Sequence, residues 1–268
     1  MNEIKLSSGQ LIRSHLSKPD DFETRLADVN YIEPDIVELP TALISAPNAV
    51  GGRNWSGAFA TPPTGEQVGI VFGDLVVPNA QSTIRLFPQV LTMWIGLDGM
   101  VDQATPFYLG VVAHAQNLFG STYNCIPFLQ WGSFSSVGIV SAVPVRAGDY
   151  LRLEIHNLKD PNDPNRIYAV ITNVTANNAG YALDIQGAQP PVGGSADWMV
   201  GSATATVSGI PRYGIVSFSS ASSYSADSAG ALIEPDPGNI LTMYDSQGKP
   251  ISVGQYANGV VECTYTGP

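Results

Sequence analysis

Charge, and basic charge above all, is scarce in this sequence. Only 13% of the 268 residues are charged, against about 25% in an average globular protein. The 12 basic and 23 acidic residues give a net charge of −11 at pH 7, and the lysines and arginines form no cluster. Nucleic acids and anionic membrane surfaces bind to basic patches, so we expect neither as a partner.

Long apolar runs and cysteines are scarce as well. No apolar stretch approaches the length of a membrane span. The first residues, MNEIKLSSGQ, lack the apolar segment of a signal peptide, so we expect a cytoplasmic protein or a secreted one whose leader has been removed. The two cysteines, Cys125 and Cys263, form no CxxC motif. This argues against a disulfide scaffold and against a zinc site of that type.

Sequence signatures of metal and cofactor sites are also missing. The histidines His15, His114 and His156 have no histidine or cysteine at i+2 or i+4. The oxygen-rich run 160–165 lacks the spacing and the glycine of an EF-hand loop, so we interpret it as a solvated hairpin tip. There is no P-loop, no dinucleotide fingerprint and no G-x-S-x-G elbow. We therefore expect neither a metal nor a cofactor.

What the chain does have is a series of short β-rich runs separated by turn residues. It contains 27 glycines and 20 prolines, and alternation with a period of two in residues 150–155 places Arg152 and Glu154 on one face. With about a dozen such runs and no convincing helix between them, we predict an all-β fold, an antiparallel sandwich of two curved sheets. The expected strands are 57–61, 67–77, 89–98, 105–115, 125–134, 149–158, 166–174, 182–188, 197–205, 214–224, 240–245 and 260–266.

The first 48 residues differ from the remainder. Ser7 and Ser8 precede an apolar segment that begins at Leu11, and Asp20 with Glu23 forms a possible capping box, so helix signals concentrate here. Prolines near residue 40 would break any long helix. We predict an N-terminal extension, 1–48, that packs along a single sandwich domain, 49–268.

Five short motifs follow one another along the predicted sandwich. They read RNWSGA at 53–58, LVVP at 75–78, WIGLDG at 94–99, AGD at 147–149 and VECTY at 261–265. In this order they resemble motifs of the glutamic peptidases, or eqolisins. The resemblance implies a concanavalin-like sandwich with a substrate groove on one concave face, and cleavage of peptides at acid pH by a Gln–Glu dyad that activates water.

The positions that match the dyad carry other residues. Tyr108 stands where the motif match places the family's glutamine, and Gly201 where it places the glutamate. A groove carboxylate of the family becomes Gln130, and an aspartate becomes Val112. Activation of water needs a group that can accept a proton, which neither Tyr108 nor Gly201 supplies. We therefore expect no catalytic residues and a catalytically degenerate family member.

Neutral polar and aromatic groups in place of carboxylates suggest a binding groove. We expect an extended glycan or peptide as the partner, held in a lectin-like manner. Asp98 is expected to shape the turn of the WIGLDG motif, as aspartates in such turns commonly do. The four tryptophans are expected to divide between core packing and ligand stacking. The residues predicted to line the groove are Trp94, Asp98, Tyr108, Phe128, Gln130 and Gly201.

The closing motif bears on the redox state. Cys263 matches a cysteine that many family members bond to one in the preceding strand. The corresponding stretch here, 250–253, contains no cysteine. In this respect the chain departs from the family, and the loss of the partner cysteine suits a reducing compartment.

Two other functions remain open from the sequence. The first is an active acid endopeptidase or other hydrolase with a displaced catalytic pair, for which Asp98, Asp102 and Asp197 are candidate carboxylates. The second is a structural subunit of a larger assembly, which the weakly charged, serine-rich composition permits.

Overall fold

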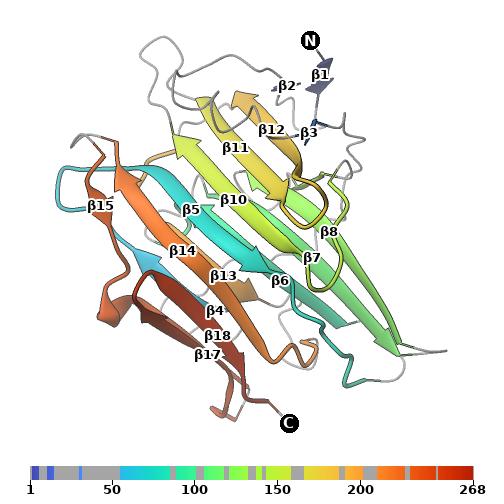
Figure 1. Cartoon of the computed structure of the whole chain (residues 1–268). Helices are drawn as coiled ribbons and strands as arrows, with labels where there is room; N and C mark the ends of the chain where they lie inside the picture. The colour runs from blue at the N-terminus through green and yellow to red at the C-terminus, as the bar shows by residue number, and fades with distance from the viewer. Residues whose placement is uncertain are drawn as a thin grey trace.

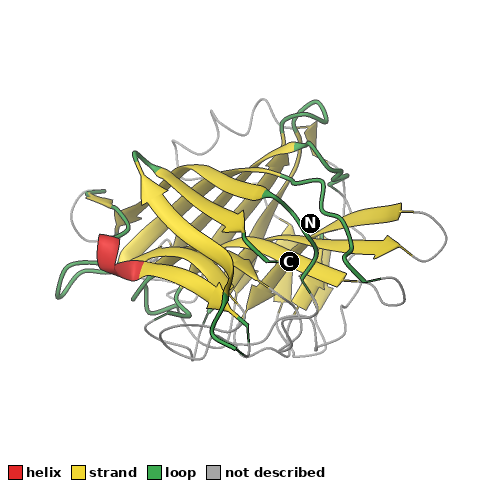
Figure 2. Ribbon diagram, turned by 90° about the horizontal axis from the view of Figure 1, so that it is seen from below, coloured by secondary structure: helices red, strands yellow, loops and turns green. Residues whose placement is uncertain are grey.

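The structure, a computed structural model of the chain, consists almost entirely of β-strands (Figure 2). In the part of the chain that the structure describes, the one helical element is a 3-10 turn, η3, at Pro237–Asn239. No helix in this part is long and apolar enough to cross a membrane. The described residues are 2–5, 11–14, 30–31, 55–84, 89–100, 106–117, 121–131, 137–140, 143–157, 166–186, 191–201, 210–226, 230–245 and 247–267.

One antiparallel sheet, sheet A, has the strand order β12–β11–β10–β5–β14–β18–β17, with β15 paired to the end of β14. It forms the layer nearest the viewer in Figure 1. Its strands are β5 (Val68–Val76), β10 (Tyr150–Asn157), β11 (Arg166–Asn173), β12 (Ala179–Gln186), β14 (Ile215–Ser225), β15 (Leu232–Ile233), β17 (Pro250–Ala257) and β18 (Val260–Tyr265).

The second antiparallel sheet, sheet B, lies behind the first and has the order β4–β13–β6–β7–β8–β9 (Figure 1). Strand β16 (Ile240–Tyr244) pairs with both β17 and β4, so it joins the two sheets along one side. The strands of sheet B are β4 (Trp55–Ala60), β6 (Gln89–Leu97), β7 (Phe107–Asn117), β8 (Ser121–Trp131), β9 (Val137–Ile139) and β13 (Ala196–Gly201).

The core lies between the two sheets and takes every second residue of their strands. In β10, Leu151 and Leu153 are fully buried, whereas Arg152 lies on the opposite face. Trp198 of sheet B crosses the core and donates from its indole nitrogen to the carbonyl oxygen of Phe72 in sheet A, at 2.6 Å. The sheets approach closely at Gly73, where an added Cβ would lie 2.8 Å from Ile95 Cγ2. Contacts of this kind fix how the two layers sit on each other.

The predicted fold class is confirmed, because the structure is almost all β and antiparallel. Each of the twelve expected strands overlaps a strand of the structure. Strand β17 was not among them, because Pro250 and Gly254 interrupt its β-rich pattern. The strand nevertheless forms, because Pro250 is its first residue, where a missing N–H is tolerated.

Near the N-terminus the structure differs from the sequence prediction. Leu11–Ser14 forms strand β2, which pairs with β1 (Asn2–Lys5) and with β12, while β3 (Asn30–Tyr31) pairs in parallel with β12. The helix signals after Ser7 and Ser8 therefore do not produce a helix at β2. The edge of β12 offers unpaired backbone groups, and pairing with them outweighs weak local helix signals. The capping box lies outside the described residues, and the domain boundary at residue 48 stays a prediction.

Candidate functional site

The residues that match the family's catalytic positions lie on the face of sheet B that points away from sheet A. Four consecutive strands of this sheet place Asp197 opposite Gly96, Gly96 opposite Tyr108, and Tyr108 opposite Gln130. Directly paired residues of neighbouring strands share a face. We call this row, from Asp197 across Gly96 and Tyr108 to Gln130, the polar strip.

Aromatic rings pack closely next to the polar strip. The ring centroids of Trp55 and Trp94 are 4.7 Å apart, and those of Trp94 and Tyr108 are 5.7 Å apart, with the rings steeply inclined in both pairs. Trp55 and Tyr108 also meet edge to face at 6.0 Å. Such edge-to-face contacts are favourable, and the three side chains are buried. Because the three rings cover one another, they do not form an open surface on which a ligand could stack.

Glycines let Trp94 and Asp197 lie flat against the sheet. A Cβ placed on Gly201 would lie 2.8 Å from Cη2 and Cζ3 of Trp94 and 3.1 Å from Oγ1 of Thr92. A Cβ on Gly96 would collide with the carboxyl group of Asp197. Both glycines thus make room for a neighbouring side chain, and this close approach explains why the sequence has no side chain at either position.

Asp197 is a buried carboxyl group with an incomplete set of hydrogen bonds. Its Oδ1 accepts a hydrogen bond from Nε1 of Trp94 at 3.0 Å, and its Oδ2 has no hydrogen-bond partner among the described residues. Burial raises the pKa of Asp197 well above its usual range. The Trp94 hydrogen bond lowers that pKa by less, and the charge of Asp98 raises it further. The environment therefore favours the protonated, neutral form.

Gln130, at the other end of the polar strip, also has unused hydrogen-bonding groups. Gln130 is fully buried, and within the described part of the chain neither its Oε1 nor its Nε2 has a hydrogen-bond partner. Between the two ends, burial raises the pKa of the Tyr108 phenol, and the carboxyls of Asp197 and Asp98 raise it further. Tyr108 thus stays protonated. The strip carries polar groups whose bonding capacity the described residues leave partly unused.

Asp98 lies in the turn of the WIGLDG motif, and its carboxyl group binds the backbone of a segment that is distant in sequence. Its backbone is left-handed, with φ 63°, a conformation that aspartate tolerates. Its Oδ2 accepts from the backbone N–H groups of Val192 and Gly193 at 2.8 and 3.1 Å, and its Oδ1 accepts from that of Gly194 at 2.6 Å. The carboxyl group of Asp98 therefore fastens the segment that leads into β13, and through it the position of Asp197.

The structure brings five of the six predicted groove residues to one face of sheet B, and all six are buried. Asp98 lies just beyond the end of β6 and turns toward the segment before β13. That these residues line a groove stays a prediction. Asp197 was expected only as a displaced carboxylate, and Asp102 lies outside the described residues. Period-two alternation in 196–201 could have placed Asp197 on the face of Gly201. The five residues on the shared face are Trp94, Tyr108, Phe128, Gln130 and Gly201.

Both cysteines are free and buried. Cys263 pairs across the sheet with Gly254, and its Sγ donates to the carbonyl oxygen of Ser56 at 3.4 Å. Next to it, the hydroxyl of Ser252 forms hydrogen bonds with those of Ser56 and Tyr213 inside the core. The described residues contain no group of three or more potential metal ligands. The 160–165 run lies outside them.

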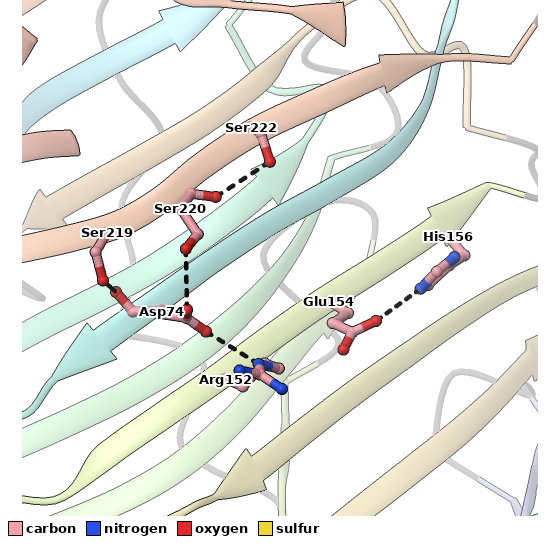
Figure 3. A network of polar contacts seen from close by, with 7 residues as sticks. All are labelled: Asp74, Arg152, Glu154, His156, Ser219, Ser220 and Ser222. Atoms are coloured by element: carbon pink, nitrogen blue, oxygen red, sulfur yellow. Dashed lines mark hydrogen bonds and ion pairs between the residues drawn. The ribbon is translucent and has the colours of Figure 1, made fainter. Parts of the chain in front are cut away.

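A second polar network lies on the outer face of sheet A (Figure 3). Arg152 Nε contacts Asp74 Oδ1 at 3.2 Å, and Ser220 Oγ donates to Asp74 Oδ2 at 3.1 Å. His156 Nε2 lies 3.2 Å from Glu154 Oε2. Ser220 sits at a bulge of β14 with φ 53°. Asp74 pairs with Arg152 and also accepts from Ser220 at the bulge, so we assign the network a role in fixing the bulge.

Comparisons with solved structures identify a shared fold. The crystal structure of Scytalido-glutamic peptidase with a peptide-based transition state analog superimposes with a TM-score of 0.61 and 16% identity, over 80% of this chain and 98% of that one. A structure of SCP-B, a member of the eqolisin family of peptidases, in complex with a tripeptide gives 0.57 and 15%, over 80% and 98%. Aspergilloglutamic peptidase from Aspergillus niger gives 0.54 and 17%, over 66% and 99%.

Comparison with sequences identifies the family. No curated protein sequence matches this chain. The sequence model of the peptidase A4 family matches residues 53–265, which is most of the chain. This range includes all five motifs and every residue of the polar strip. The chain therefore belongs to the peptidase A4 family, the glutamic peptidases or eqolisins.

Proposed function

We propose that this family member does not cleave peptides by the Gln–Glu mechanism and that it binds an extended ligand, a glycan or a peptide, at the outer face of sheet B. The observation that carries the proposal is the pair of residues at the matched dyad positions. Tyr108 and Gly201 supply neither a carboxylate nor an amide.

The surroundings of these two residues support the loss of that chemistry. A general base must accept a proton, and the buried Tyr108 phenol has a raised pKa and remains a donor. Gly201 has no side chain, and the Trp94 ring fills the space in which a longer residue would begin. Regaining a glutamate here would require Trp94 to move as well.

A role in binding is supported by the polar strip. Asp197 and Gln130 are buried with unused hydrogen-bonding atoms, and buried polar atoms are normally paired. A ligand that reaches them would supply the missing partners. Ligand binding would give the outer face of sheet B a function that does not depend on bond cleavage.

The test is a digest of casein and haemoglobin between acid and neutral pH. The double variant Tyr108→Gln, Gly201→Glu is assayed alongside the wild type. We expect no cleavage by the wild type, because loss of a catalytic base commonly lowers rates by several orders of magnitude. Robust wild-type cleavage that survives Asp98→Ala would show that a working pair lies elsewhere.

A second candidate function, a hydrolase with a displaced pair, is favoured by one observation. Asp197 supplies a carboxyl group of raised pKa and Gln130 an amide on the same face. A carboxyl group with a raised pKa can donate or accept a proton in a hydrolytic reaction. Under this alternative, Asp197→Asn abolishes any hydrolysis that the wild type shows, whereas Asp98→Asn leaves its pH profile in place.

A further inference from the structure

Residues Asn173, Val174 and Thr175 form a motif in sheet A that the proposed function does not use. Their sequence is an Asn-X-Thr sequon, the acceptor sequence for N-linked glycosylation. An N-linked glycan is bulky and hydrophilic, so the asparagine that carries it lies on the protein surface. Asn173 is instead the last residue of β11 and is fully buried. The position of the asparagine therefore conflicts with the modification that the sequon predicts.

The folded protein uses both ends of the Asn173 amide. Its Nδ2 donates to the carbonyl oxygen of Pro144 at 2.6 Å and to Oδ2 of Asp149 at 2.7 Å. Its Oδ1 accepts from the backbone N–H of Ala176 at 3.0 Å. An asparagine amide has two N–H donors, so both hydrogens of Nδ2 are engaged. Acceptors next to Nδ2 and a donor next to Oδ1 also determine which way the amide points.

Through these bonds Asn173 holds the turn that precedes β10. Asp149 belongs to the AGD motif of this turn, and its Oδ2 also accepts from the backbone N–H of Arg146 at 2.8 Å. Val77, the residue after β5, donates its N–H to the carbonyl oxygen of Asp149 at 2.9 Å and accepts from the N–H of Gly148 at 2.8 Å. The Asn173 amide thus connects the end of β11, the AGD turn and the end of β5.

N-linked glycosylation is incompatible with these contacts. The reaction joins Nδ2 of the asparagine to the anomeric carbon of a lipid-pyrophosphate-linked oligosaccharide, while the lipid pyrophosphate leaves and Nδ2 loses one proton. The modified Nδ2 keeps one N–H for two acceptors, so either the carbonyl oxygen of Pro144 or the carboxyl group of Asp149 loses its donor. The sugar would also need space beside an atom in a closely packed, fully buried side chain.

We propose that glycosylation of Asn173 and folding of this domain exclude each other. Strands β14, β17 and β18 of sheet A follow Asn173 in the sequence. Sheet A is therefore incomplete when this residue is synthesised, and a glycosyltransferase that acts on nascent chains would meet an exposed amide. Such a pathway would trap the chain in a glycosylated, unfolded form. The chain therefore matures where the Asn173 amide is left unmodified.

The experiment sends the full chain, behind a cleavable secretion signal, through a eukaryotic secretory pathway. Asn54→Gln removes the other sequon of the sequence. Val260→Thr creates a control sequon at Asn258, which is exposed in the turn between β17 and β18. This control shows that the transferase reaches an exposed asparagine of the same chain.

The matched variant is Thr175→Asp, which removes the Asn173 sequon and leaves the Asn173 amide in place. Aspartate keeps a side-chain oxygen for the backbone N–H of Tyr150, from which Thr175 Oγ1 accepts at 2.9 Å. An inhibitor of lipid-linked oligosaccharide synthesis, applied to the chain with Thr175, makes the same comparison without a substitution there.

Mass spectrometry measures glycan occupancy in secreted, protease-resistant protein and in protein retained by the cell. We expect a glycan on Asn258 in the secreted protein and a complete loss of glycan from Asn173 in the same pool. Chains with a glycan on Asn173 should be retained and protease-sensitive. Thr175→Asp and the inhibitor should each eliminate these chains and raise the secreted yield.

Secreted, protease-resistant protein with a glycan on Asn173 would overturn the proposal. Retention of protease-sensitive chains under both Thr175→Asp and the inhibitor would also overturn it, because something other than the Asn173 glycan would then block folding. If Asn173 is unmodified in both pools while Asn258 carries its glycan, the exclusion holds, because burial of Asn173 has preceded glycan transfer.

Discussion

Gly201 lies beneath the indole ring of Trp94, so closely that a Cβ at position 201 would be 2.8 Å from two ring carbons. The ring cannot easily yield, because Trp55 and Tyr108 pack against it edge to face. Packing against Trp94 thus requires a small residue at this matched dyad position, and glycine also lacks the catalytic side chain. Substitutions at Gly201 and at neighbouring residues test this packing through the stability of the folded protein.

Gly201→Ala should destabilise the protein by about 1 to 3 kcal/mol, the usual cost of inserting a methyl group into a well-packed site. Urea denaturation monitored by tryptophan fluorescence measures this. Gly238→Ala is the matched control, because the nearest atom to its added Cβ is an exposed carboxyl oxygen at 3.4 Å. Equal stability of both variants would contradict the tight contact with Trp94.

Asp98→Asn should lower stability by about 2 to 3 kcal/mol, because charge-assisted hydrogen bonds to buried backbone donors are lost. Asparagine tolerates the left-handed backbone equally well, so the change isolates the carboxylate. Hydrogen exchange at the amides of Val192, Gly193 and Gly194 should accelerate selectively. Unchanged protection of these three amides would refute the anchoring role of Asp98.

Asp197→Asn should stabilise the protein relative to wild type increasingly as pH rises. Burial raises the pKa of Asp197 in the folded state, so between its unfolded and folded pKa the folded protein binds the proton and the unfolded chain does not. Wild-type stability therefore falls as pH increases through this window, which begins at about 4. Thermal melting across pH measures the difference, with Glu234→Gln, an exposed carboxylate, as the control. A constant difference in melting temperature would show that Asp197 is not perturbed.

The two partners of the Arg152–Asp74 ion pair on sheet A should contribute unequally to the stability of the protein. Arg152 is 53% exposed, so Arg152→Gln should cost less than about 1 kcal/mol. Asp74→Ala should cost about 1 to 3 kcal/mol, because Ser220 at the bulge also loses its acceptor. Urea denaturation of the two variants compares these values, and a larger effect of the arginine change would argue against Asp74 as the centre of the network.

Both thiols should be unreactive in the folded protein. Burial raises the pKa of Cys125 to about 11 and that of Cys263 to about 12, so the reactive thiolate is rare at neutral pH. A thiol reagent such as DTNB should modify neither residue at neutral pH until urea unfolds the chain. Cys125, which retains slight exposure, should react first, and rapid labelling of native Cys263 would contradict its burial.

Much of the fold could be predicted from the sequence because strand patterns are local. The alternation of Leu151 and Leu153 with Arg152 and Glu154 gave the two faces of β10, and the structure has them as predicted. Turn residues separated the strands correctly. The helix signals near Leu11 were misleading, because pairing of Leu11–Ser14 with the edge of β12 is a long-range interaction that no local signal reveals.

The candidate site was predictable only in part. The motifs pointed to Trp94, Tyr108, Gln130 and Gly201, and register places them on one face of sheet B. Sequence reasoning identified Asp197 only as one of three candidate carboxylates, because an aspartate at the start of an expected strand is most often solvated.

By itself, then, the sequence determined most strands of the sandwich, the two faces of β10 and the family, because periodicity and motifs are properties of neighbouring residues. Only the tertiary structure decided that Asp98 holds a segment 94 residues away, that Trp94 reaches Asp197 across 103 residues, and that Gly201 must stay small. These contacts depend on which strands become neighbours and how closely two packed layers approach. That arrangement follows from burying the whole apolar surface at once and is not encoded in any single segment.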